Sequence, residues 1–176
     1  MIIFVIIYVV IAIVGFIVGL IIYIKRNNRR KYNNAAEKII RDDLLGYSLK
    51  NPYIMDNSVK PPLARRVMIG LTIKAAGKKH SYVFDPAKRI NIGRDDKNQI
   101  IIYDASVSAY QACIYVSGGG VCVYNTGTKN PITLRRGASS RNIRPKEGFR
   151  LRDGDILLIQ NYKIKVKLFV FDINHK

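Results

Sequence analysis

Residues 110–125 read YQACIYVSGGGVCVYN, two runs rich in β-branched and aromatic residues on either side of a glycine-rich turn. This pattern predicts a β-hairpin. With residues 117–120 as the loop, the cross-strand pairs are Val116 with Val121, Cys113 with Tyr124, and Tyr115 with Cys122. The two thiols then share one face on a diagonal, at strand positions about 7–8 Å apart, which is too far for easy disulfide formation. We therefore expect two free cysteines packed in a core.

Similar runs continue in both directions from this hairpin. Between residues 66 and 172, short β-branched or aromatic runs such as VMIGLTIKA, QIIIY, DILLIQ and YKIKVKLFVFD alternate with turn signals such as RDDKN, SGGG and RDGD. No convincing helix lies between them and no fixed-period repeat is present. About ten short strands in this arrangement predict an all-β sandwich or barrel.

The N-terminus has a different character. Residues 1–24, MIIFVIIYVVIAIVGFIVGLIIYI, contain no charged residue. As a helix rising about 1.5 Å per residue, the apolar run 2–24 is roughly 34 Å long, enough to cross a hydrocarbon core of about 30 Å. A cleavable signal peptide would begin with basic residues and end with small ones, whereas this run begins uncharged and ends with large residues. We therefore expect a retained transmembrane anchor, with the lipid bilayer as a partner.

The basic cluster KRNNRRK at 25–31 follows this run directly. By the positive-inside rule it predicts a single-pass protein of the cell membrane whose C-terminal domain is cytoplasmic. The cluster contributes five of the 30 basic residues, so the remaining chain still carries +13 of the net charge of +18. Such an excess suits acidic partners: phosphoproteins, anionic lipid or nucleic acid.

Residues 34–45, NAAEKIIRDDLL, have the pattern of a short amphipathic helix with Asn34 as its cap and Gly46 at its end. Its apolar residues suit either a spacer or a dimerising or membrane-lying helix. The predicted organisation is an anchor at 1–24, a basic flank, short helix and proline-containing linker at 25–65, a β-sandwich at 66–172 and a tail at 173–176.

Motifs of catalysis are absent from the sequence. It has two histidines and no CxxC, HExxH, GxxxxGK[ST] or GxSxG, and its twelve carboxylates are mostly scattered singly. We expect no enzyme activity, no catalytic residue, no metal site and no cofactor. No helix-turn-helix or RNP-like pattern is present either, so a specific nucleic-acid partner is not expected.

Polar residues recur at predicted loop edges of the β region: Arg94 after INIG, Ser108 after DASV, and Thr128 and Asn130 in NTGTKNP. If these loops gather at one end of the sandwich, they bring together a guanidinium, two hydroxyls and an amide. Such groups suit a phosphate and a peptide backbone, because Arg forms charge-assisted forks with phosphate and Asn can both donate and accept. Ordinary turn chemistry would use the same residue types.

The order of five motifs adds to this hypothesis. Ile92-Gly93-Arg94, Asn98-Gln99-Ile100, Asp104-Ala105-Ser106-Val107-Ser108, Thr128-Lys129-Asn130 and Leu151-Arg152-Asp153-Gly154-Asp155 follow one another over roughly residues 66–172. Together they resemble the forkhead-associated (FHA) domain. The resemblance implies a β-sandwich of about eleven strands, preceded here by a transmembrane helix and a short juxtamembrane helix. It also implies binding of phosphothreonine peptides through loops at one end, without catalysis.

The resemblance assigns a role to each candidate residue. Arg94 would contact the phosphate and the peptide backbone, Ser108 and Thr128 would bind the phosphate, and Asn130 would hold the peptide main chain. Gly93 and Lys129 are secondary candidates for phosphate support. The implied partner is a threonine-phosphorylated protein, such as a Ser/Thr kinase or its substrate, in bacterial signalling at the membrane.

The chain departs from the family pattern at two places. The family usually has Arg-x-His after the serine, where this chain has Ala109-Tyr110-Gln111, and usually has Gly after the asparagine, where this chain has Pro131. These departures leave two alternatives to the phosphothreonine reader. One is a degenerate FHA scaffold that binds its partner independently of phosphorylation, and the other is a basic domain that binds anionic lipid or nucleic acid.

Overall fold

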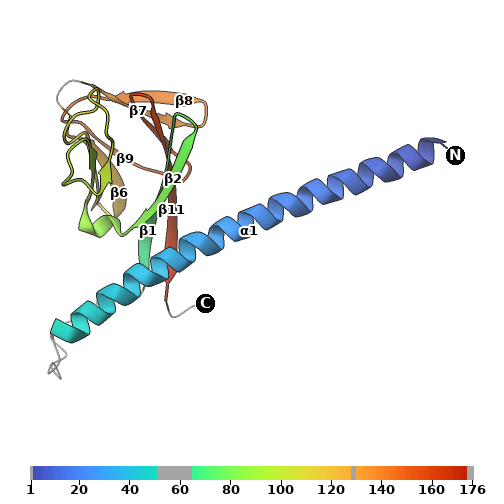
Figure 1. The fold of residues 1–176 in the computed structure, drawn as a ribbon, viewed down its shortest axis with the longest axis horizontal. Coiled ribbons are helices and arrows are strands. Elements are labelled where there is room, and N and C mark those ends of the chain that lie inside the picture. The colour runs from blue at the N-terminus through green and yellow to red at the C-terminus, as the bar shows by residue number, and fades with distance from the viewer. Residues whose placement is uncertain (1, 51–64, 128–129, 174–176) are drawn as a thin grey trace. The chain divides into compact units, whose positions relative to one another are not determined.

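The computed structural model describes residues 2–50, 65–127 and 130–173, which contain one α-helix, eleven strands and a short 3-10 turn (Figure 1). Thr128 and Lys129 lie outside the described residues. The chain forms two compact units, Met1–Ala35 and Ala36–Lys176. The elements are α1 (Ile2–Lys50), β1 (Arg65–Ala75), β2 (Lys78–Phe84), η1 (Pro86–Lys88), β3 (Ile90–Gly93), β4 (Ile100–Ile101), β5 (Ala112–Ser117), β6 (Gly120–Asn125), β7 (Ile132–Arg136), β8 (Ser139–Ile143), β9 (Gly148–Arg150), β10 (Ile156–Ile159) and β11 (Tyr162–Asp172).

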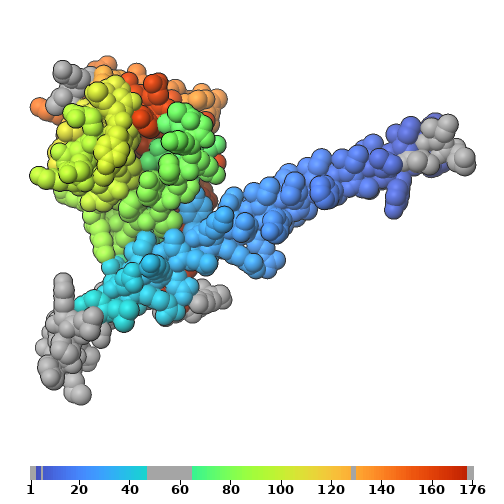
Figure 2. Space-filling model, in the orientation of Figure 1, coloured from blue at the N-terminus to red at the C-terminus, as the bar shows by residue number. Residues whose placement is uncertain are grey.

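The first unit consists of the N-terminal part of α1. Within the described residues, α1 is the one helix long and apolar enough to cross a membrane. Figure 2 shows side chains projecting along this blue part of the helix. Its large apolar side chains, for example Phe4 and Phe16, are exposed. A helix that is apolar all round needs an apolar surrounding, which makes it a candidate membrane anchor.

The prediction of two separate helices was wrong, because α1 runs without a break from Ile2 to Lys50. The connecting residues 25–33 are Lys, Arg, Asn and Tyr, without proline or glycine. Lys and Arg are good helix formers, so nothing in this stretch forces a break. Asn34 therefore lies inside a helix instead of capping one, and Gly46 does not end it.

The strands form two packed sheets, in the orders β2-β1-β11-β10-β7-β8 and β4-β3-β5-β6-β9. Side chains from both sheets enclose a core that is almost entirely aliphatic, including Ile92, Ile114, Val123 and Ile164. The predicted β-sandwich of about eleven strands is confirmed.

The hairpin that joins β5 and β6 has the predicted register, with Val116 opposite Val121. Cys113 and Cys122 are free thiols, as expected. They do not lie in the core, however, because the buried residues of these strands are their neighbours Ile114 and Val123. Since side chains alternate along a strand, both cysteines lie half-buried on the outer face of the five-stranded sheet.

The second unit includes the last part of α1, which packs on the outer face of the six-stranded sheet. Ala36 and Ile40 are buried in a small cluster with Met68 of β1 and Phe171 of β11. The apolar face predicted for residues 34–45 therefore exists, and the structure shows it packed against the chain's own sandwich.

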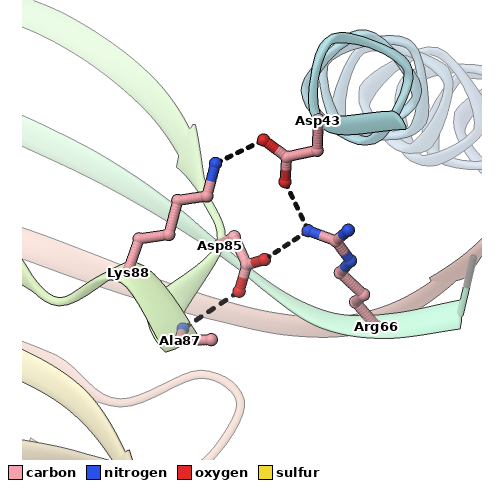
Figure 3. Close-up of polar contacts among 5 residues, drawn as sticks. All are labelled: Asp43, Arg66, Asp85, Ala87 and Lys88. Atoms are coloured by element: carbon pink, nitrogen blue, oxygen red, sulfur yellow. Dashed lines mark hydrogen bonds and ion pairs between the residues drawn. The ribbon is translucent and has the colours of Figure 1, made fainter. Parts of the chain in front are cut away.

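Four charged side chains from the helix and the sandwich form a network (Figure 3). Arg66 Nη1 lies 2.5 Å from Asp43 Oδ2 and 2.8 Å from Asp85 Oδ2, and Lys88 pairs with the other oxygen of Asp43. Burial disfavours the charged form of Asp43, but hydrogen bonds from Lys88 and Arg66 outweigh it and hold its pKa below the ordinary value. The helix segment is thus attached by apolar contacts and by an ion-pair network, which together we call the helix dock.

Candidate functional site

Four connections meet at one end of the sandwich, and they follow β3, β4, β6 and β10. The carbonyl of Ser106, after β4, accepts hydrogen bonds from Asn130 Nδ2 at 3.2 Å and from Gln160 Nε2 at 3.3 Å. The Arg94 N–H, after β3, donates to the Ser108 carbonyl at 3.0 Å. The loops that carry Arg94, Ser108 and Asn130 are therefore brought together, as the sequence predicts.

Gly93 makes the approach of Arg94 to Ser108 possible. A Cβ at position 93 would lie 2.2 Å from the carbonyl oxygen of Ala109, a distance that no side chain tolerates. The N–H of Asp95 donates to that same oxygen at 3.1 Å. Gly93 thus has a definite structural role, which is to let the two loops run side by side.

The polar side chains on these two loops have hydrogen-bonding capacity that the described residues do not use. The side chain of Arg94 is exposed, and within the described part of the chain its guanidinium forms no hydrogen bond or ion pair. Ser108 is half-buried, and its hydroxyl has no partner among those same residues. A guanidinium and a hydroxyl on adjoining loops are groups that bind an oxyanion.

Asn130 is a structural member of the loop cluster as well as a candidate for binding. Its Nδ2 donates to Ser106, while its main-chain carbonyl accepts from Asn125 Nδ2 at 3.1 Å and from Gln111 Nε2 at 3.3 Å. Its Oδ1 accepts no hydrogen bond from the described residues, so it can accept one from an N–H of a bound peptide.

Two amide side chains, Gln111 and Asn125, support the loop cluster through hydrogen bonds, and both are fully buried. Gln111 Oε1 accepts from the Ser108 N–H at 3.3 Å, and Gln111 Nε2 donates to Asn125 Oδ1 at 3.0 Å. Asn125 Oδ1 also accepts from the Gly127 N–H at 3.0 Å. A Cβ at position 127 would lie 2.2 Å from Gln111 Nε2, so Gly127 leaves room for the pair. We call these two side chains the amide brace.

Two carboxylates shape the exposed loops. The Lys97 N–H donates to Asp95, and the Ser106 hydroxyl and N–H both donate to Asp104. These hydrogen bonds favour the ionised carboxylates and lower both pKa values. In the part of the chain that the structure describes, no group of three or more His, Cys, Asp or Glu side chains could hold a metal ion.

Comparison with known proteins identifies the domain. Residues 90–160, which span the whole loop cluster, match the family model of the FHA domain. The chain carries an FHA domain. No curated protein sequence matches it significantly.

Solved structures of FHA domains share this fold. The FHA domain of an Arabidopsis thaliana protein is 20% identical, with 67% of this chain and 95% of that chain covered and a TM-score of 0.50. The FHA domain of CT664 from Chlamydia trachomatis is 17% identical over 57% of this chain and 96% of that chain (TM-score 0.47). EmbR of Mycobacterium tuberculosis, solved in complex with a low-affinity phosphopeptide, is 21% identical over 56% of this chain (TM-score 0.46). Only 24% of the EmbR chain is covered.

The sequence did not predict the amide brace of this FHA domain. Gln111 stands where the family usually has His, and it joins the loops through three hydrogen bonds of its own. A signal existed, because Gln111 and Asn125 are amides at the matching ends of two paired apolar strands, where Ala112 lies opposite Asn125. Pro131 lies exposed just before β7, at a position where a proline without an N–H is tolerated.

Proposed function

We propose that this FHA domain binds a threonine-phosphorylated protein through Arg94, Ser108, Thr128 and Asn130. FHA domains are interaction modules and not enzymes, and phosphothreonine-dependent partner binding is the general activity of the family. Gly93 and Lys129 would support the phosphate from the same loops. The partner would be a Ser/Thr kinase or one of its substrates.

The guanidinium of Arg94, which has no partner among the described residues, is the observation that carries this proposal. Arg66 and Arg136, by comparison, are paired with carboxylates of the fold. Arg94 is instead exposed beside Ser108, on a loop fixed by main-chain hydrogen bonds. Because this geometry is set before a ligand arrives, little ordering is needed on binding.

The candidate anchor in α1 bears on where in the cell the FHA domain would act. We propose that α1 crosses the cell membrane once and that the FHA domain lies in the cytoplasm. Tethering would then hold a phosphorylated partner at a raised local concentration near other membrane proteins. The basic cluster at 25–31 supports this orientation.

The test is a titration of the full chain in nanodiscs with a degenerate phosphothreonine peptide pool and with its unphosphorylated counterpart. We expect saturable binding of the phosphorylated pool only. Arg94→Ala should weaken binding by about tenfold to a hundredfold, because a charge-assisted hydrogen bond contributes roughly 1.5–3 kcal/mol. Lys97→Ala removes an exposed cation from the same loop and should leave the affinity unchanged.

Equal binding of the two pools would contradict the proposal. If a partner were then retained by the Arg94→Ala variant, the domain would be a scaffold independent of phosphorylation. Binding that ignores phosphothreonine and collapses steeply with salt would indicate a basic domain for anionic ligands.

A further inference from the structure

The outer face of the six-stranded sheet is strongly basic beyond the helix dock. The strand residues on this part of the face include four lysines, one arginine, several hydroxyls and an amide, but no Asp or Glu. The five cations, which we call the basic face, are Lys74, Lys79, Lys163, Lys165 and Arg135, and all five are exposed.

The arrangement of these cations is unfavourable for the isolated fold. Lys74 lies directly opposite Lys79 on β2 and directly opposite Lys163 on β11, so three like charges form one row across three strands. Like charges directly opposite each other destabilise a sheet. Lys167, the next cation along β11, is by contrast paired with Asp153 at 2.7 Å. Within the described residues no ion pair compensates the basic face.

The chemistry of the face selects among polyanions. The strand residues on it include no aromatic side chain between the helix dock and the loop end, so it offers no stacking platform for the bases of a single-stranded nucleic acid. Its neutral members include the hydrogen-bonding side chains of Ser81, Ser140 and Asn142. The aliphatic Ile156 and Leu158 of β10 lie between them, opposite Lys165 and Lys163. Cations spread among such groups over several strands suit a surface of many separate anions.

The covalent structure keeps the sandwich near such a surface. Ala36 is buried against the outer face of this same sheet, and α1 is continuous from there back to Lys25, where the apolar run ends. Eleven residues of α-helix span only about 16 Å. If α1 is the membrane anchor, this short connection limits how far the sandwich can lie from the lipid headgroups.

We propose that the basic face binds anionic phospholipid headgroups of the membrane in which α1 is anchored. The sandwich would then be held to the bilayer twice, once by the helix and once by this face. Negative lipids attract Lys and Arg near the membrane surface, and the attraction is screened by salt. The proposal rests on the proposed anchoring by α1, but it does not depend on phosphothreonine binding.

The experiment measures how fast an amine-acylating reagent modifies individual lysines of the full chain in nanodiscs. One set of nanodiscs contains phosphatidylcholine alone, and in the other set one third of the lipid is phosphatidylserine. We expect Lys74, Lys79, Lys163 and Lys165 to be acylated several-fold more slowly in the phosphatidylserine nanodiscs. High salt should abolish this protection, and Lys97 and Lys146, which are exposed elsewhere on the domain, should react equally in both.

Two triple variants test whether the protection depends on the basic face or only on the net charge of the chain. In both variants the acylation of Lys165 is measured. Lys74→Gln, Lys79→Gln and Lys163→Gln together should remove the protection of Lys165. Lys97→Gln, Arg144→Gln and Lys146→Gln together change the net charge equally and should leave that protection intact.

Three outcomes would overturn the proposal: equal acylation of Lys165 in both lipids, equal loss in both triple variants, or protection by added polyglutamate but not by phosphatidylserine. The last outcome would assign the face to an acidic protein. Failure of the chain to enter nanodiscs would instead refute the anchoring, and phosphopeptide titration of the same samples tests the proposed function separately.

Discussion

At the scale of single residues, the loop end depends on a few buried polar groups. Gln111 satisfies Ser108, Asn125 and Asn130 at once, although it stands in place of the histidine that the family usually has. Both amides of the brace are fully buried, so their hydrogen bonds are shielded from water. A buried polar group that loses its partner is destabilising, which makes the brace a sensitive position.

We predict that Gln111→Met lowers the free energy of unfolding by about 1–3 kcal/mol, because it keeps the shape of the side chain but removes three hydrogen bonds. Amide hydrogen exchange should accelerate at Ser108 and Gly127, which both bond to the brace. Thr126→Val, which removes one exposed hydrogen bond to the Tyr110 carbonyl, should change stability by less than about 0.5 kcal/mol. Unchanged exchange at both amides in Gln111→Met would contradict the role of the brace.

At the scale of elements, the end of α1 is part of the folded domain. Ala36 and Ile40 contribute to a buried cluster, and Asp43 joins the network around Arg66. The side chains of Asp43 and Arg66 are only 17% and 13% exposed, so their interaction is less screened than that of a surface pair.

We predict that Asp43→Asn destabilises the domain by about 1–2 kcal/mol at neutral pH, since Arg66 still retains Asp85. Asp42→Asn, which changes an exposed neighbouring carboxylate, should have no measurable effect. Urea unfolding of the full chain in nanodiscs would compare the two variants.

The pH dependence of that difference follows from the lowered pKa of Asp43. A carboxylate whose pKa is lower in the folded state stabilises the fold fully above its unfolded pKa of about 3.9, and this stabilisation disappears as the pH falls through the folded pKa. The gap between wild type and Asp43→Asn should therefore be constant from neutral pH down to about 5 and close in stronger acid. A gap that widened on acidification would refute the role of the ionised carboxylate.

The elements also show what the sequence could and could not predict. The hairpin register was predictable because the turn glycines leave few ways to pair two short strands. The helix boundaries were not, since local signals at Asn34 and Gly46 are weak beside a helix that continues on both sides. The amide brace and the helix dock join residues far apart in the chain, and no local pattern encodes such contacts.

At the scale of the whole molecule, the predictions of membrane anchoring and orientation can be tested together. We predict that green fluorescent protein fused to the C-terminus is fluorescent, and that alkaline phosphatase fused there is inactive, because the positive-inside rule predicts a cytoplasmic C-terminus from the basic cluster at 25–31. Mass spectrometry of the membrane-extracted chain should show residues 1–24 retained. A mature chain without them would indicate a signal sequence instead.

The helix dock and the loop cluster lie at opposite ends of β11. The helix dock involves Phe171 at the end of β11, whereas the loop cluster includes Gln160, just before β11 begins. The ten residues from Tyr162 to Phe171 span about 30 Å in an extended strand. Substitutions at sites this far apart usually act additively. Substitutions in the loop cluster can therefore change which peptide the domain prefers without weakening the helix dock. The same attachment to α1 is then compatible with domains of different peptide specificity.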